Sequence, residues 1–146
     1  MCKRKGWNCI EQPERGSIGD LVRYRIEIAK SDLLSANILL KEGEYRGANN
    51  RAYYAVYHAI SAVHALDGKS YKRHKDTLAN FNKDYVKTEI FPKIFGRRIA
   101  RAEEIRHASD YDDFYIATKE KAEEQILTAK ELIEQIDAYC FRRLKE

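Results

Sequence analysis

Residues 48–67 read ANNRAYYAVYHAISAVHALD, a run of 20 residues without proline or glycine. Alanine, tyrosine and valine recur on all sides of a helical projection of this run, and Gly68 follows it directly. Glycine just after an apolar run is typical of a helix C-terminus. A helix that is apolar all round must be covered by other helices, so the run predicts the central helix of a domain.

Helical patterns precede and follow this central segment. Ser17 and Asp20 have the spacing of a capping box, and a long first helix is expected from there to Gly43. Its apolar positions at helical spacing are Leu21, Tyr24, Ile28 and Leu39. After the centre, residues 68–76 (GKSYKRHKD) predict a basic loop and residues 76–86 (DTLANFNKDYV) a short helix or turn.

Two further helices are expected in the second half of the chain. Pro92 suits the first turn of one of them, because proline lacks the N–H that would be unpaired there. Its apolar side consists of Phe95, Ile99, Ala102 and Ile105. Thr118 is a plausible N-cap for the last helix. The apolar seam of that helix consists of Ala122, Ile126, Ala129, Ile133, Ile136, Cys140 and Leu144.

The composition supports one all-α domain. The chain has 146 residues with only 2 prolines and 7 glycines, and no segment alternates apolar and polar residues as a strand does. We therefore predict a bundle of four or five helices over residues 17–146, with residues 1–16 as a flexible basic arm. The sequence contains neither an apolar run that could span a membrane nor a signal peptide, so a soluble, cytoplasmic protein is expected.

The charge is unevenly distributed. Residues 69–108 carry 11 basic and 5 acidic side chains, whereas residues 109–146 carry 6 basic and 10 acidic ones. A basic middle is suited to a polyanion such as nucleic acid, although an ordinary charged surface would have the same composition.

Two groups of residues depart from the pattern of apolar interior and charged surface. The first is Asn50, Arg51, Tyr54 and His58 in the central helix, a polar stripe that needs partners on a neighbouring helix. The second is the segment RRIARAEEIRHASDY, which contains Arg97, Arg98, Arg101, Arg106, His107 and Tyr111. At about 100° per residue, Arg101 and His107 lie about 120° apart around a straight helix. They can act on one phosphate only if the helix ends near His107 or a second copy supplies one of them.

Most familiar catalytic sites have no counterpart here. No pair of histidines, cysteines or carboxylates has metal-ligand spacing, and there is no glycine-rich phosphate loop or nucleophile elbow. We therefore expect neither a metal nor a cofactor. Two possibilities remain: metal-free catalysis by arginine and histidine, and binding without catalysis.

Together these segments resemble the HEPN superfamily (higher eukaryotes and prokaryotes nucleotide-binding), in particular its small stand-alone branch from bacteria and archaea. The resemblance rests on N-R-x-Y-Y at residues 50–54, F-x-K-x-Y-V at 81–86, RRIARAEEIRHASDYDDF at 97–114 and the last helix. It covers about residues 20–144.

The resemblance implies an up-and-down bundle that forms homodimers. It also implies a metal-independent endoribonuclease of toxin–antitoxin or defence systems, whose signature is an arginine, four to six residues and a histidine. Arg101 and His107 match this signature and would be the catalytic pair. Arg97, Arg98 and Arg106 would then hold the RNA.

A partner is implied as well. Relatives are commonly encoded beside a minimal nucleotidyltransferase antitoxin, which in some pairs modifies a tyrosine near the arginine–histidine motif, and Tyr111 is the candidate here. The alternative is a non-catalytic subunit that binds a nucleotide or docks such a partner through Asn50, Arg51, Tyr54 and Arg106. A purely structural dimeric bundle is the third possibility.

Overall fold

The computed structural model describes residues 17–146, and the arm predicted at residues 1–16 lies outside them. All regular elements in the described range are helical, which confirms the all-α prediction. They are α1 (Ile18–Lys41), α2 (Tyr45–Leu66), α3 (His74–Phe81), the short π-helix η1 (Asn82–Val86), α4 (Ile94–Tyr111) and α5 (Lys119–Lys145). None of these helices is both long and apolar enough to cross a membrane.

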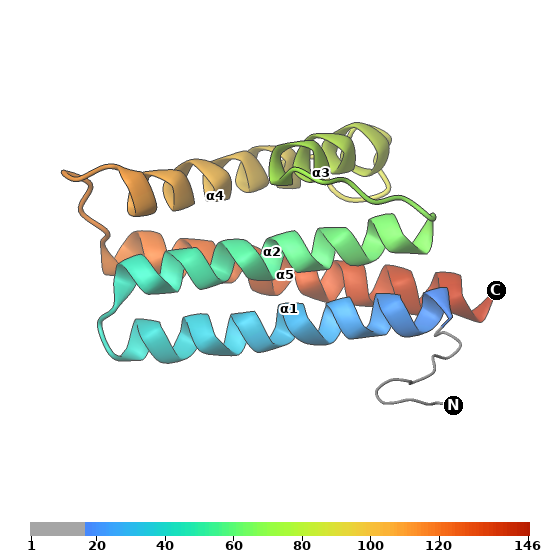
Figure 1. Ribbon diagram of the computed structural model, residues 1–146, viewed down its shortest axis with the longest axis horizontal. Coiled ribbons are helices and arrows are strands. Elements are labelled where there is room, and N and C mark those ends of the chain that lie inside the picture. Colours follow the sequence, from blue (N-terminus) through green and yellow to red (C-terminus); the bar gives the residue numbers. More distant parts are fainter. Residues whose placement is uncertain (1–16) are drawn as a thin grey trace, which may run out of the picture.

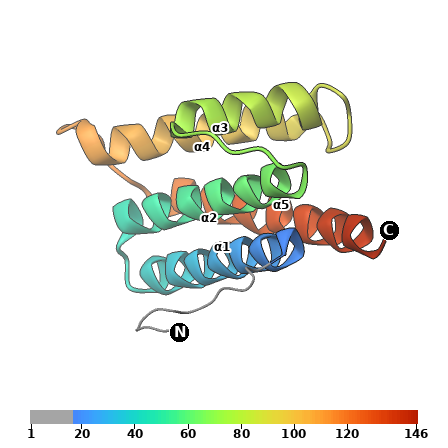
Figure 2. The same ribbon diagram turned by 45° about the vertical axis from the view of Figure 1, so that its right-hand side comes forward.

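The four long helices form an up-and-down bundle. They run along the long axis of the molecule and alternate in direction in chain order (Figure 1). Helices α2 and α5 lie between α1 on one side and α3 with α4 on the other, as Figure 2 also shows. Because α2 packs against α1, α3, α4 and α5, the segment at residues 48–67 is the central helix, as predicted.

Small side chains explain how α2 can occupy the centre. Of its 22 residues 12 are buried, and six of these are alanines. Alanine lets the backbones of neighbouring helices approach closely, while larger residues such as Tyr53 and Ile60 fill the spaces that remain. Since α2 has neighbours on several sides, its buried polar residues, Asn49 and His64, lie against other helices.

The buried face of α1 does not include all of the apolar positions that indicated the helix. Leu21 and Tyr24 are 41% and 63% exposed. The residues that pack against the core are Val22, Ile26, Ala29 and Ala36. Helix α1 has apolar residues on two sides, and the side that carries alanines is the one that packs against the alanine-rich α2. The predicted long first helix is confirmed, and Leu21 and Tyr24 lie outside its buried face.

The ends of the helices follow the local signals. Ser17 accepts a hydrogen bond from the backbone N–H of Asp20, whose carboxylate accepts one from the backbone N–H of Ser17, which is the predicted capping box. Gly43 and Gly68 end α1 and α2 with φ of 78° and 73°, a region that glycine enters without strain. The Thr118 hydroxyl accepts from the backbone N–H of Lys121 and caps α5, as predicted.

Helix α4 begins slightly later than predicted. It starts at Ile94, and Pro92 precedes it in a tight turn whose carbonyl accepts the N–H of Phe95. The predicted apolar side of α4 is buried, as is the predicted seam of α5 up to Cys140. Burial raises the pKa of the Cys140 thiol to about 12, which is consistent with the prediction that Cys140 packs as a small apolar residue.

Candidate functional site

The two residues of the predicted catalytic pair lie on one uninterrupted helix. Helix α4 continues through Arg101 and His107 to Tyr111, so of the two conditions for a shared phosphate, a second copy of the chain is the one that remains. In a regular helix six residues correspond to about 9 Å along the axis and a rotation of about 120° between the two side chains. One chain alone therefore directs Arg101 and His107 to different sides of α4.

The arginines on one side of α4 are paired with carboxylates of α5. Arg101 contacts Glu124, with its Nε 2.8 Å from one carboxylate oxygen and its NH2 3.4 Å from the other. Both side chains are close to half exposed, at 43% and 47%. The hydrogen bond from Arg101 to Glu124 raises the pKa of Arg101 above its usual range. The guanidinium is thus oriented in advance, in contact with solvent.

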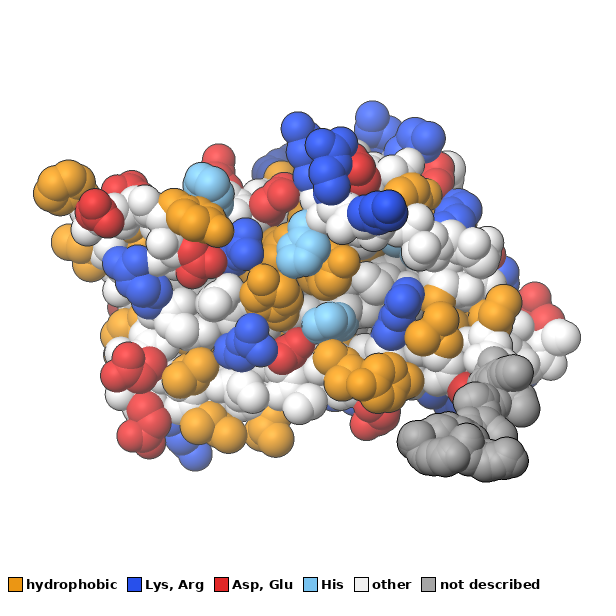
Figure 3. All heavy atoms as spheres, in the orientation of Figure 1, with side chains coloured by type: hydrophobic (Ala, Val, Ile, Leu, Met, Phe, Trp, Pro, Cys, Tyr) orange, Lys and Arg blue, Asp and Glu red, His pale blue; other side chains and the backbone are white. Residues whose placement is uncertain are grey.

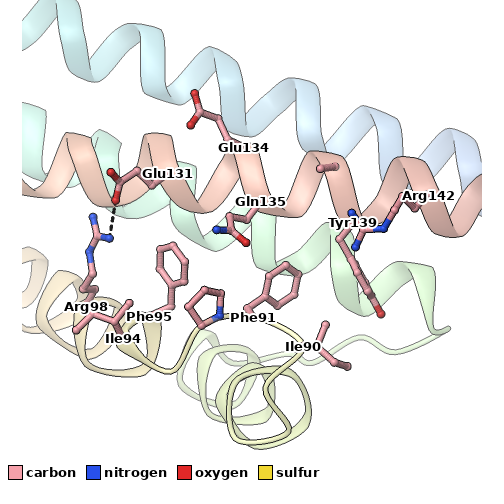
Figure 4. A pocket seen from close by; sticks show the side chains of 12 residues that line it. Ile90, Phe91, Ile94, Phe95, Arg98, Glu131, Glu134, Gln135, Tyr139 and Arg142 are labelled. Atoms are coloured by element: carbon pink, nitrogen blue, oxygen red, sulfur yellow. Dashed lines mark hydrogen bonds and ion pairs between the residues drawn. The ribbon is translucent and has the colours of Figure 1, made fainter.

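Arg98 is similarly bound but more enclosed. Its NH1 lies 2.6 Å from Glu131, and its Nε donates to the Thr128 hydroxyl at 3.1 Å. This ion pair closes one end of a groove of about 580 Å³ between the start of α4 and α5, which Phe91 and Tyr139 also line (Figure 4). The groove includes neither Arg101 nor His107. The predicted RNA-binding residue Arg97 is exposed on α4.

His107 and Tyr111 form an exposed pair at the C-terminal end of α4. They are one helical turn apart, with ring centroids separated by 4.9 Å and planes inclined by 45°. The Tyr111 side chain is 66% exposed. Within residues 17–146 the imidazole of His107 makes no hydrogen bond that would occupy its ring nitrogens. Both rings are accessible to a large substrate or to a partner protein.

Arg106, although adjacent to His107, faces the bundle. Its NH2 donates to the Tyr54 hydroxyl at 3.2 Å, and its Nε lies 3.3 Å from the carboxylate of Asp110. The guanidinium also lies over the Tyr53 ring, 5.1 Å from the centroid. Arg106 therefore links α4 to the centre of α2, and its side chain is only 21% exposed.

Two residues of the polar stripe of α2, Asn50 and Arg51, were expected to hydrogen-bond to a neighbouring helix, and only Arg51 does so. Arg51 donates to Asp32 of α1 at 3.0 Å, so the expected bond to a neighbouring helix is confirmed. Asn50 makes no such bond: its buried Oδ1 has no hydrogen-bond partner within the described range. The preceding residue Asn49 instead donates to the Ser109 hydroxyl of α4 at 3.3 Å. Asn49 and Asn50 are consecutive, so their side chains leave α2 about 100° apart. Only the side chain of Asn49 reaches α4.

The rings of Tyr57, His58 and His74 lie together, and this group was not predicted from the sequence. His74 begins α3 rather than lying in the basic loop. Its ring lies against that of Tyr57, with centroids 4.1 Å apart and planes inclined by 31°. His58 lies 5.4 Å from the same tyrosine, and its Nε2 is 3.7 Å from Asp32. Burial lowers the pKa of both histidines. The spacing of Tyr54, Tyr57 and His58 on one side of α2 was visible in the sequence, whereas the position of His74 depends on the loop.

These rings are found on one face of the molecule. Figure 3 shows histidines there among apolar and basic side chains, with lysines and arginines concentrated near α3. Across residues 17–146 no group of three or more histidines, cysteines or carboxylates is arranged to hold a metal ion.

With this geometry established, comparison with known proteins identifies the class. A model of the HEPN domain family matches residues 22–139, and the chain therefore belongs to the HEPN domain family. This confirms the resemblance found in the sequence.

Individual relatives agree with this assignment. A UPF0332 protein of Thermotoga maritima is 31% identical over 117 residues, which cover 80% of this chain and 89% of that protein. A protein of Methanocaldococcus jannaschii named "Putative toxin" is 31% identical over 119 residues, covering 82% and 88% of the two chains. A crystal structure from Thermus thermophilus matches the fold with a TM-score of 0.69 at 21% identity, over 80% of this chain and 96% of that one.

Proposed function

We propose that the protein is a metal-independent endoribonuclease that acts as the toxin of a toxin–antitoxin or defence system. Membership of the HEPN family and the name "Putative toxin" carried by the Methanocaldococcus jannaschii relative support the toxin assignment. The observation that carries the nuclease assignment is that α4 presents Arg101 and His107 to solvent, six residues apart.

RNA is a suitable substrate for this pair because it contains its own nucleophile. An imidazole can take the proton from the 2′-hydroxyl as the 2′-oxygen attacks the adjacent phosphorus. The bond from phosphorus to the 5′-oxygen breaks, and the protonated imidazole can give its proton to that oxygen. The products are a 2′,3′-cyclic phosphate and a 5′-hydroxyl. Histidine suits both proton transfers because its charge changes near neutral pH.

Arg101 would stabilise the charge that develops on the phosphate. A guanidinium remains cationic and can contact two non-bridging oxygens at once. In the free protein Glu124 occupies this fork. Since exposed ion pairs contribute only about 0.2–1 kcal/mol, a phosphate can replace the carboxylate at low energetic cost.

A homodimer would bring the two groups together. A two-fold axis beside α4 places two arginine–histidine sets in one cleft, with His107 of one copy near Arg101 of the other. Because Arg101 and His107 lie about 120° apart around one helix, each copy can then contribute its arginine to one site and its histidine to the other. Arg97 and Arg98 would hold the flanking RNA backbone in a manner that depends on salt concentration.

A nucleotidyltransferase antitoxin fits the same surface. Tyr111 is 66% exposed, and its ring lies beside that of His107. A nucleotide attached to the Tyr111 hydroxyl would place a bulky, negatively charged group next to the imidazole and block the approach of RNA.

The test is incubation of the purified protein with total cellular RNA in the presence of EDTA. We expect the parent to cleave RNA, and Arg101→Ala and His107→Ala to lose cleavage with an unchanged helical circular dichroism spectrum. Both residues are exposed on α4, so their loss should leave the fold intact. Equal cleavage by the parent and His107→Ala would refute the proposal.

A further inference from the structure

The rings at the junction of α2 and α3 form a connected, partly exposed surface. The ring of Tyr57 lies against that of His74, with centroids 4.1 Å apart, and the neighbouring centroid distances are 5.4 Å from Tyr57 to His58 and 5.7 Å from Tyr54 to His74. All four side chains are intermediate in exposure. We call Tyr54, Tyr57, His58 and His74 the aromatic platform.

Two guanidiniums flank the platform. That of Arg51 lies 4.9 Å from the centroid of the Tyr54 ring, and that of Arg106 lies 5.7 Å from the same centroid. Asp32 orients Arg51, and Asp110 orients Arg106. Each guanidinium has five N–H donors, and these contacts do not use all of them. Arg51, at 38% exposed, is the more accessible of the two to a ligand.

The surroundings favour a polyanion rather than an isolated apolar ligand. The loop and first turn of α3 beside His74 carry Lys72 and Lys75, which are exposed and form no ion pair with residues 17–146. Flat rings next to exposed cations are the combination by which proteins bind unpaired nucleic acid. The bases stack on the rings and the backbone follows the positive charge.

The platform is also close to the proposed cleavage site. Arg106 contacts Tyr54 of the platform and is directly followed in the chain by His107. Arg106 thus connects the platform to the turn of α4 that carries His107. A strand bound at His107 could place a neighbouring nucleotide on the platform.

We propose that the aromatic platform binds an unpaired nucleobase of the RNA and thereby directs cleavage to single-stranded segments. This inference rests on the proposed ribonuclease function. A base within a duplex is stacked between its neighbours and cannot also lie on the platform. The alternative hypothesis assigned nucleotide binding to Asn50, Arg51, Tyr54 and Arg106. Three of these, Arg51, Tyr54 and Arg106, thus act on the same strand as the catalytic pair.

The experiment measures RNA binding without cleavage, in His107→Ala protein. The probes are a fluorescently labelled single-stranded oligoribonucleotide and the same strand in a duplex. In this background, Tyr57→Leu and His58→Ala remove rings of the platform. The control Phe141→Leu removes a ring that is 61% exposed on α5.

Loss of base stacking should weaken single-strand binding by about 5- to 150-fold. We expect that loss for Tyr57→Leu and His58→Ala, with duplex binding nearly unchanged. Phe141→Leu should bind like its parent. Tyr57→Phe keeps the ring and should restore binding, which separates stacking from a general effect on the fold. A 2-aminopurine base in the strand should be quenched by the parent and not by Tyr57→Leu.

Equal binding by the platform variants and their parent would overturn the inference, as would an equal loss for single and double strands. The two proposals fail separately. If the protein with an intact His107 cleaves RNA and the platform variants bind and cleave single strands as it does, only the platform is refuted. If that protein cleaves no RNA while the platform variants lose single-strand binding, the nuclease is refuted and the platform remains as a binding site.

Discussion

The ion pair between Arg101 and Glu124 allows a test of whether Arg101 contacts a phosphate of the RNA. Replacing Glu124 by glutamine keeps the size of the side chain and removes the charge that occupies the guanidinium. If Arg101 contacts a phosphate in the complex, binding must break this pair in the parent protein but not in Glu124→Gln. The variant should therefore bind RNA more tightly.

The size of the effect follows from the exposure of the pair. With side chains 43% and 47% exposed, the pair belongs to the surface class, which contributes about 0.2–1 kcal/mol. Glu124→Gln should therefore tighten RNA binding by about 1.4- to 5-fold. The free energy of unfolding should fall by no more than about 1 kcal/mol.

The control is Glu123→Gln, which removes the same charge from an adjacent exposed position of α5. Both variants are compared in His107→Ala protein by fluorescence anisotropy with a labelled RNA over a range of salt concentrations. Removal of one acidic charge affects both variants alike, so their difference isolates the release of Arg101. Indistinguishable affinities for Glu124→Gln and Glu123→Gln would refute the reasoning.

Three further predictions concern stability. Ser17→Ala removes the N-cap of α1 and should lower the free energy of unfolding by about 1 kcal/mol in urea titrations; an unchanged midpoint would contradict the capping box. Gly43→Ala should cost about 1–2 kcal/mol because φ is positive there, and Gly43→Asn should cost less; equal losses would exclude the backbone explanation. Burial lowers the pKa of His64, whose ring bonds to the Thr77 carbonyl. The unfolded chain therefore takes up more protons, and stability should be fully present above pH about 6.5 and decline below it. His64→Gln should decline less steeply in urea titrations at stepwise lower pH, and a decline as steep as the parent's would show that His64 is not responsible.

Much of the helical architecture could be predicted because its signals are local. The cap at Ser17, the glycine after α2 and the seam of α5 each depend on residues within a few turns of one another. The buried face of α1 could not be predicted in the same way. Leu21 and Val22 are both apolar, and only the packing of α1 against α2 and α5 decides that Val22 is buried and Leu21 exposed.

Only part of the candidate site could be predicted, because its contacts join residues that are far apart in the chain. The order of Arg101, Arg106 and His107 along the chain identifies the motif and its helix. The sequence does not show that Glu124 occupies the guanidinium of Arg101, because that contact joins α4 to α5 across 23 positions of the chain. The aromatic platform likewise depends on the loop that places His74 on Tyr57.

A mixing experiment shows whether two copies of α4 share one catalytic site. Arg101→Ala and His107→Ala proteins are each assayed alone, and then as a 1:1 mixture after subunit exchange, on RNA with EDTA present. If Arg101 of one copy acts with His107 of the other, half of the dimers are mixed and each contains one intact site. The mixture should then regain about a quarter of the parent's cleavage rate. A mixture as inactive as its two components would contradict a site shared between two copies of α4.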